Sequence, residues 1–207
     1  MKIKVLVVDD HQNVRIGLRK MLNHSPAVEV VGEAGNGEEA LQLAQELEPD
    51  VLLLDVEMPG MNGYEVARRI TNSGQTSRVL ALSGHNEKRN ILGMFASGAV
   101  GYITKDEAPE QLLTAIVEVA AGKRGWISQN VAKIIGVPAQ SVGRNTIPAL
   151  SSKEKAVLNL IIAGKSDAEI LRLMEMDPPD LKSKIEAINM KLGAKSRLEA
   201  IVRAMQE

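Results

Sequence analysis

Five short apolar runs alternate with segments of helical period over the first 121 residues of this 207-residue chain. Each run is long enough for one strand, and the segments between them repeat apolar residues every three or four positions, as amphipathic helices do. Strands connected through helices run parallel, and right-handed crossovers place helices on both faces of the sheet. The sequence therefore predicts a doubly wound α/β domain with a five-stranded parallel sheet, its strands at residues 3–8, 28–33, 51–55, 78–83 and 100–104.

Acidic residues stand at the ends of two of these runs. Asp9 and Asp10 follow the first run, and Asp55 ends the third. Parallel strands deliver their carboxyl-terminal residues to one edge of the sheet, where ligands bind in folds of this kind. Three carboxylates gathered there repel one another unless a cation is present, and hard oxygen ligands suit Mg²⁺. A carboxylate beside a metal can also act as a nucleophile toward a phosphoryl group.

Polar residues also end the last two runs, since Ser83 closes the fourth and Lys105 follows the fifth. With this set in order, the first 121 residues resemble the receiver domain of two-component response regulators, which has a flavodoxin-like sheet. The resemblance implies that Asp55 accepts a phosphoryl group from a sensor histidine kinase and that Ser83 and Lys105 bind the phosphoryl oxygens. It also implies that Tyr102 turns inward when Ser83 is drawn to the phosphate.

The same resemblance implies a magnesium site made by Asp9, Asp10, Asp55 and the backbone carbonyl of Glu57. Glu57 and His85 are expected at the mouth of the site, where they could obstruct or orient attacking water; an exposed loop histidine without a catalytic role is the alternative for His85. Uptake and loss of one phosphoryl group would not make the protein an enzyme. A metal-dependent phosphatase is less favoured, because the residues after Asp55 lack the acid and hydroxyl pattern of such enzymes.

The last 58 residues have a helical pattern throughout. Three helix starts are marked by capping residues or by an N-cap followed by proline: Ser151 with Glu154, Ser166 with Glu169, and Asp177 with Pro178. Four short helices with a tight turn between the second and third predict a helix-turn-helix domain. The preceding glycines and prolines indicate a linker, in which Trp126 to Ile135 is expected to form a short helix packed on one domain. The predicted units are therefore residues 1–121, a linker at 122–149, and an all-α domain of four helices at 150–207.

The segments from Leu150 to Leu158, from Ile161 to Ser166 and from Lys191 to Ala200 resemble the LuxR-type DNA-binding domain. Together the two halves resemble the NarL/FixJ class of response regulators over nearly the whole chain. The resemblance implies a recognition helix at residues 178–192 and a domain that phosphorylation frees or dimerises for binding to promoter DNA. The candidate DNA contacts are Lys182, Ser183, Lys184, Glu186, Lys191, Lys195 and Arg197.

Two acids depart from the family pattern on the expected recognition helix. Asp180 replaces a hydroxyl that would approach a phosphate, although an acid at a helix N-terminus is also favourable for the helix itself. Glu186 falls on the outward face, where it could contact cytosine or simply be solvated. These acids motivate an alternative function: a regulator whose helical domain binds another protein instead of DNA in response to phosphorylation.

Charge and composition are consistent with a two-domain regulator. Residues 1–121 hold 11 Lys and Arg against 17 Asp and Glu, whereas residues 122–207 hold 14 against 9. The basic half is therefore the one expected to contact nucleic acid. The chain has no cysteine and no apolar run near the roughly 18 residues that a membrane span needs. We expect a cytoplasmic protein that forms a homodimer when it is phosphorylated or bound to DNA, without a membrane partner.

Overall fold

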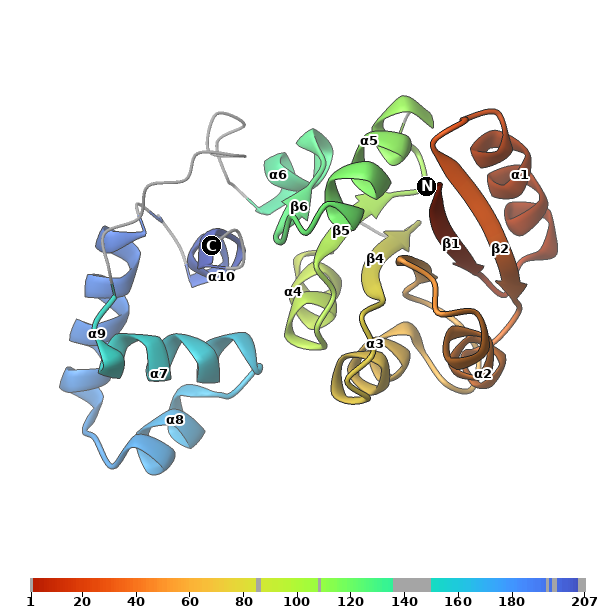
Figure 1. Ribbon diagram of the computed structural model, residues 1–207. Helices are drawn as coiled ribbons and strands as arrows, with labels where there is room; N and C mark the ends of the chain where they lie inside the picture. Colours follow the sequence, from red (N-terminus) through yellow and green to blue (C-terminus); the bar gives the residue numbers. More distant parts are fainter. Residues whose placement is uncertain are drawn as a thin grey trace.

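The computed structural model describes residues 2–84, 87–107, 109–135, 150–192, 194 and 197–204. Its N-terminal part is built on one parallel β-sheet with the strand order β2-β1-β3-β4-β5-β6 (Figure 1). The order reverses between β1 and β3, which is where ligands bind in doubly wound sheets. The strands span Ile3–Val8 (β1), Val28–Ala34 (β2), Val51–Asp55 (β3), Arg78–Ser83 (β4), Gly101–Thr104 (β5) and Trp126–Ile127 (β6).

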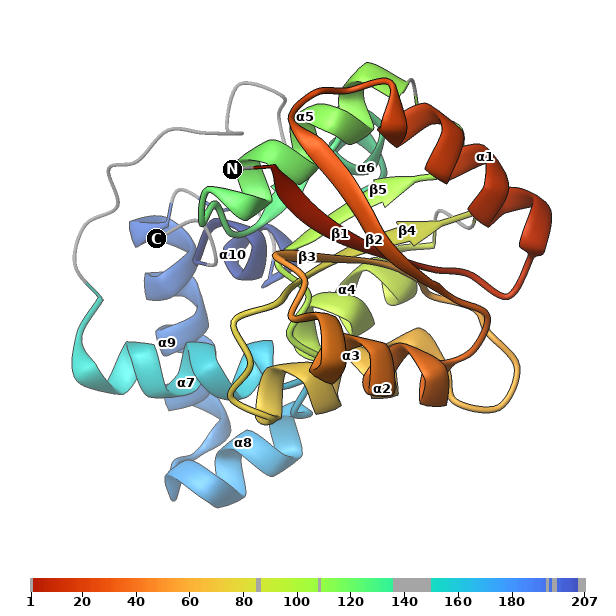
Figure 2. The ribbon, with the colours of Figure 1, turned by 45° about the vertical axis from the view of Figure 1, so that its right-hand side comes forward.

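Helices cover both faces of this sheet because its inner strands are apolar on both sides. In β1, Val5 and Val7 belong to one core cluster, and Leu6 and Val8 belong to the other. The helices α1 (Gln12–Asn23) and α5 (Pro109–Ala120) pack on the first face. The helices α2 (Gly37–Leu47), α3 (Gly63–Asn72) and α4 (Lys88–Ala96) pack on the second (Figure 2). This arrangement confirms the doubly wound α/β fold.

In the part of the chain that the structure describes, the sheet has six strands, one more than the five predicted. The additional strand β6 lies in the segment assigned to the linker, and it pairs Trp126 with Gly101 and Ile127 with Tyr102. A Cβ on Gly101 would lie 3.3 Å from the Cβ of Trp126, so glycine allows this close approach. A strand of two residues is too short to show alternation in the sequence; only its pairing with β5 defines it. The expected short helix follows as α6 (Gln129–Ile135), and residues 136–149 of the predicted linker lie outside the described residues.

Among its described residues, the C-terminal part contains four helices, as predicted: α7 (Ser152–Ile162), α8 (Asp167–Met174), α9 (Pro178–Lys191) and α10 (Arg197–Ala204). Both predicted capping boxes form, at the starts of α7 and α8. Asp177 is the N-cap of α9, but its side chain makes no capping hydrogen bond. The helices α7, α8 and α9 enclose a core around Ile170, Leu181 and Ile188. In the part of the chain that the structure describes, none of the helices has the length and apolarity needed to cross a bilayer.

Candidate functional site

Four parallel strands bring polar side chains together at one edge of the sheet. Asp9 directly follows β1, Asp55 ends β3, Ser83 ends β4, and Lys105 directly follows β5. These strands are paired in parallel along their carboxyl-terminal halves, so their ends lie side by side. The polar cluster therefore lies at the carboxyl ends of the strands, next to the point between β1 and β3 where the strand order reverses.

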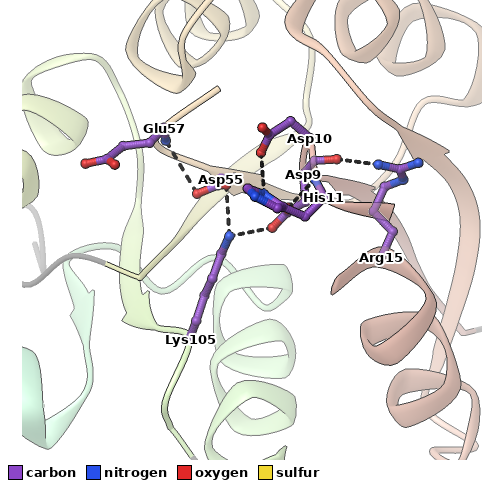
Figure 3. Close-up of polar contacts among 7 residues, drawn as sticks. All are labelled: Asp9, Asp10, His11, Arg15, Asp55, Glu57 and Lys105. Atoms are coloured by element: carbon purple, nitrogen blue, oxygen red, sulfur yellow. Dashed lines mark hydrogen bonds and ion pairs between the residues drawn. The ribbon is translucent and has the colours of Figure 1, made fainter. Parts of the chain in front are cut away.

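Lys105 joins two buried carboxylates at this edge (Figure 3). Its Nζ lies 2.6 Å from Oδ2 of Asp9 and 2.9 Å from Oδ2 of Asp55. Asp9 is 0% exposed and Asp55 is 4% exposed. Burial raises the pKa of the Asp55 carboxyl because the charged form loses water, and the Lys105 ammonium opposes this shift. Burial acts to lower the pKa of Lys105, but the two carboxylates outweigh it, so that pKa is raised and the side chain stays charged.

The carboxylates fit a hard divalent cation. Asp9, Asp10, His11 and Asp55 each place one possible ligand atom within 4.8 Å of the others. Oδ2 of Asp9 is buried and lies 2.6 Å from the ammonium of Lys105, which neutralises part of its charge. The three carboxylates carry more negative charge than the one ammonium of Lys105 can balance. Mg²⁺ favours negatively charged oxygen ligands of this kind. His11, which the sequence analysis did not single out, contacts Oδ1 of Asp10 at 2.8 Å, and its place directly after the acidic pair could have identified it.

Two further residues that were not predicted make contacts around the site. Arg15 donates a hydrogen bond to the backbone carbonyl of Asp9 at 2.7 Å, which fixes the loop after β1. The Asn90 amide of α4 donates to Oε1 of Glu57 at 3.3 Å, and the backbone N–H of Glu57 lies 3.4 Å from Oδ1 of Asp55. Asn90 thus connects α4 to the loop after β3. It is 33 positions from Glu57 in sequence, so no local pattern could have found it.

Ser83 and Tyr102 are both completely buried beside the site. Burial raises the pKa of the Tyr102 hydroxyl to about 12, and its hydrogen bond with Ser83 opposes the shift. Tyr102 therefore occupies an inward position next to Ser83, the two residues expected to form the switch. Two other predicted residues, His85 and Lys195, lie outside the described residues.

The outward face of α9 carries charges of both signs. Lys182, Ser183 and Glu186 are exposed, as is Asp180 in the first turn, whereas Lys184 is partly buried. This face has the position of a recognition surface in a helix-turn-helix unit, because α8 and α9 are joined by a short turn and the opposite face of α9 is buried. A surface of mixed charge attracts phosphates less strongly than a basic surface does.

Two of the candidate DNA contacts are engaged in ion pairs within the domain. Lys191 lies 2.7 Å from Oε2 of Glu154, which is 5% exposed, and so ties the end of α9 to the start of α7. Arg197 forms an ion pair with Asp167 and donates to the carbonyl of Lys165 at 2.9 Å. Both side chains therefore hold helices together in this structure.

Comparison with known proteins agrees with this geometry. Residues 5–117 match the model of the response regulator receiver domain, and residues 148–204 match that of bacterial regulatory proteins of the luxR family. The nitrate/nitrite response regulator protein NarL of Escherichia coli K12 is 32% identical over 206 residues, 98% of this chain and 95% of that protein. The chain belongs to the NarL/FixJ class of response regulators. As a two-component response regulator it controls transcription.

Other relatives of this response regulator match over similar lengths. The probable transcriptional regulatory protein NarL of Mycobacterium tuberculosis is 34% identical, covering 100% of this chain and 95% of that protein. The crystal structure of the response regulator ChrA, from a heme-sensing two-component system, has a TM-score of 0.57 at 30% identity and covers 98% of this chain and 96% of that one. Receiver domains generally bind Mg²⁺ at an acidic pocket, and the cluster at Asp9, Asp10 and Asp55 provides one here.

Proposed function

We propose that the carboxylate of Asp55 accepts a phosphoryl group from a sensor histidine kinase. The observation that carries the proposal is the ammonium of Lys105, 2.9 Å from Asp55 at an edge of the sheet where two more carboxylates converge. An oxygen of Asp55 attacks phosphorus, the bond from phosphorus to the kinase imidazole breaks, and the imidazole leaves with the electron pair. Lys105 and Ser83 then hold phosphoryl oxygens, Lys105 through a charge-assisted hydrogen bond.

The proposed magnesium site consists of Asp9, Asp10, Asp55 and the backbone carbonyl of Glu57. The ligand atoms of Asp9, Asp10 and Asp55, which lie within 4.8 Å of one another, support this assignment. A bound magnesium ion supplies positive charge that neutralises the carboxylates and the incoming phosphoryl oxygens. The protein's own chemistry is limited to taking up this group and losing it to water, so we do not classify the protein as an enzyme.

Phosphorylation by acetyl phosphate with Mg²⁺ tests the assignment. Intact-mass measurement should show one added phosphoryl group on the native protein and none on Asp55→Asn. Asp50→Asn is the matched control, because Asp50 precedes β3 at the opposite edge of the sheet, where its carboxylate accepts a hydrogen bond from the backbone of Lys4. Phosphate that persists on the Asp55→Asn protein would falsify the assignment.

The proposed output is binding of promoter DNA by α9, with Lys182, Ser183, Lys184 and Glu186 nearest the groove. The family match and the exposure of this face support the proposal. Lys191, Lys195 and Arg197 complete the predicted contact set, and two of these would have to leave or share their internal ion pairs. We further propose that the protein forms a homodimer on phosphorylation or DNA binding. It would act in the cytoplasm, where kinase and promoter are both accessible.

A second candidate function is phosphorylation-dependent binding of another protein through the same helix. Asp180 and Glu186 on its exposed face favour this alternative, because each would approach anionic phosphates on DNA. Mobility-shift assays on genomic fragments distinguish the two functions. Binding by the phosphorylated protein to specific fragments supports transcriptional control through α9, whereas the absence of binding to any fragment favours a protein partner.

A further inference from the structure

A cavity of about 670 Å³ lies between the sheet-containing part of the molecule and the C-terminal helices. Its walls come from α4 and α6 on one side, and from α7, α10 and the residues between α7 and α8 on the other. Figures 1 and 2 both show α7 and α10 on the side of the sheet that carries α4. This volume is typical of small-molecule sites, which often lie between domains. The cavity is separate from the phosphoacceptor site, because it shares no residue with the carboxylate cluster.

The cavity is apolar along most of its wall. Leu92 and Ala96 of α4 face Ile161 of α7 and Ile201 of α10, and Ile135 closes the α6 side. The two parts of the molecule come close at one end, where a Cβ on Gly164 would lie 3.8 Å from the Cβ of Ala96. An apolar ligand would therefore be covered by both parts at once.

Basic side chains complete the lining, and none of the described residues that line the cavity is acidic. The four bases are Lys88, Arg89, Lys165 and Arg197. Three of them have ion-pair partners outside the lining, whose side chains are 55%, 60% and 38% exposed: Glu87, Asp167 and Glu169. The ion pair of Arg89 with Glu87 is exposed on both sides and therefore weak, so a bound anion could compete for the hydrogen-bond donors of Arg89. The charge of the lining thus favours an anion.

We propose that this cavity binds a small aliphatic carboxylate. Its hydrocarbon chain would contact Leu92, Ile161 and Ile201, and its carboxylate would lie near Lys88 and Arg89 at the start of α4. A cation of the same size would be repelled, and a neutral molecule would gain no charge-assisted contact with the bases. Because both parts of the chain form the walls, an occupied cavity would stabilise their present arrangement.

Titration calorimetry on the full-length unphosphorylated protein tests this proposal with octanoate, 1-octanol and octylammonium, which share one hydrocarbon chain. We expect one octanoate site, an affinity at least about tenfold above that of octanol, and no octylammonium binding. The double variant Lys88→Gln with Arg89→Gln should lower octanoate affinity at least about fivefold and leave octanol unchanged. Lys153→Gln with Lys155→Gln removes the same charge at exposed positions of α7 outside the lining and should leave both affinities unchanged.

Isoleucine methyl NMR locates the site independently of these variants. Octanoate should shift the methyl signals of Ile135, Ile161 and Ile201, and should leave Ile116, which lies in the core on the other face of the sheet, in place. Circular dichroism establishes that each variant is folded. Failure to bind octanoate, equal binding of all three probes, or methyl shifts confined to residues outside the cavity would each overturn the proposal. Equal loss of affinity in the two double variants would also overturn it, because this result indicates general charge attraction.

Discussion

The ammonium of Lys105 neutralises part of the charge of two carboxylates that are almost completely buried. In this position it would compete with a divalent cation for Asp9 and Asp55, and in the proposed function it would also hold a phosphoryl oxygen. Tyr102, with a pKa raised to about 12, stays protonated throughout the physiological range. Its hydrogen bond with Ser83 is therefore insensitive to pH in that range.

Replacing Lys105 with alanine should separate these two roles. We expect Mg²⁺ to bind at least as tightly, with a gain of up to about tenfold, because the competing ammonium is gone. Dimerisation linked to phosphorylation should be lost, since the charge-assisted contact to the phosphoryl group, worth roughly 1.5 to 3 kcal/mol, is missing. Calorimetry measures the first effect and analytical ultracentrifugation the second, with Lys20→Ala on α1 as a control. A collapse of Mg²⁺ affinity with dimerisation intact would show that the roles are reversed.

Among the helices, α9 combines an exposed face of mixed charge with a buried attachment to α7. Lys191 and the backbone N–H of Ser151 both contact the carboxylate of Glu154, which completes a capping box at the same time. The pKa of Glu154 is lowered from 4.5 to about 2. The hydrogen bond from Lys191 is the largest cause, and hydrogen bonds from the backbone and side chain of Ser151 add to it. The orientation of the proposed recognition helix thus depends on an ion pair at its far end.

Lys191→Ala should lower the melting temperature of the C-terminal domain by several degrees at neutral pH. The pair stabilises the charged carboxylate of Glu154, so its contribution is present above pH 4.5 and is lost as the pH falls toward about 2. The difference between the variant and the native protein should therefore shrink across this interval. Thermal melts at a series of pH values measure it, with Lys155→Ala on the exposed side of α7 as the control. A constant difference at all pH values would mean that Lys191 acts through packing of its aliphatic chain.

Asp180→Thr should strengthen DNA binding without unfolding the domain. The change removes a favourable interaction with the helix dipole, worth about 0.3 to 1 kcal/mol. It also relieves repulsion from a nearby phosphate, which can reach about 1 kcal/mol or more at a partly desolvated interface. Fluorescence anisotropy at low salt should show the gain, because screening is then weakest. Equal affinities of the two proteins at low salt would place Asp180 away from the DNA.

Across the whole molecule, negative charge is concentrated in the part built on the sheet. Residues 1–135, which include β6 and α6, hold 14 bases against 17 acids, a net charge of −3, whereas residues 150–207 hold 10 against 9, a net charge of +1. The C-terminal helices would therefore supply only a weak general attraction to DNA, and the sheet-containing part would add a repulsion. Binding should therefore be modest and sensitive to salt.

The affinity of the phosphorylated protein for duplex DNA should fall steeply as salt increases. Each neutralised phosphate contributes about −0.9 to the slope of log affinity against log salt. Lys184→Ala should reduce the magnitude of this slope by about one, equally on all sequences, if its partly buried side chain reaches a phosphate. Lys155→Ala, on α7, should leave the slope unchanged. An affinity independent of salt would rule out phosphate contacts and favour the protein partner.

The order of strands and helices, the capping boxes of α7 and α8, and the residues of the carboxyl edge were all determined by the sequence. Local periodicity defines an element, and parallel connections then force Asp9, Asp55, Ser83 and Lys105 to a common edge. Tertiary structure alone decided β6, whose two residues become a strand through pairing with β5. It also decided the pairing of Lys191 with Glu154, 37 positions away, and the cavity shared by α4 and α10. Contacts between distant segments depend on how whole elements pack, and no periodicity within one segment encodes them.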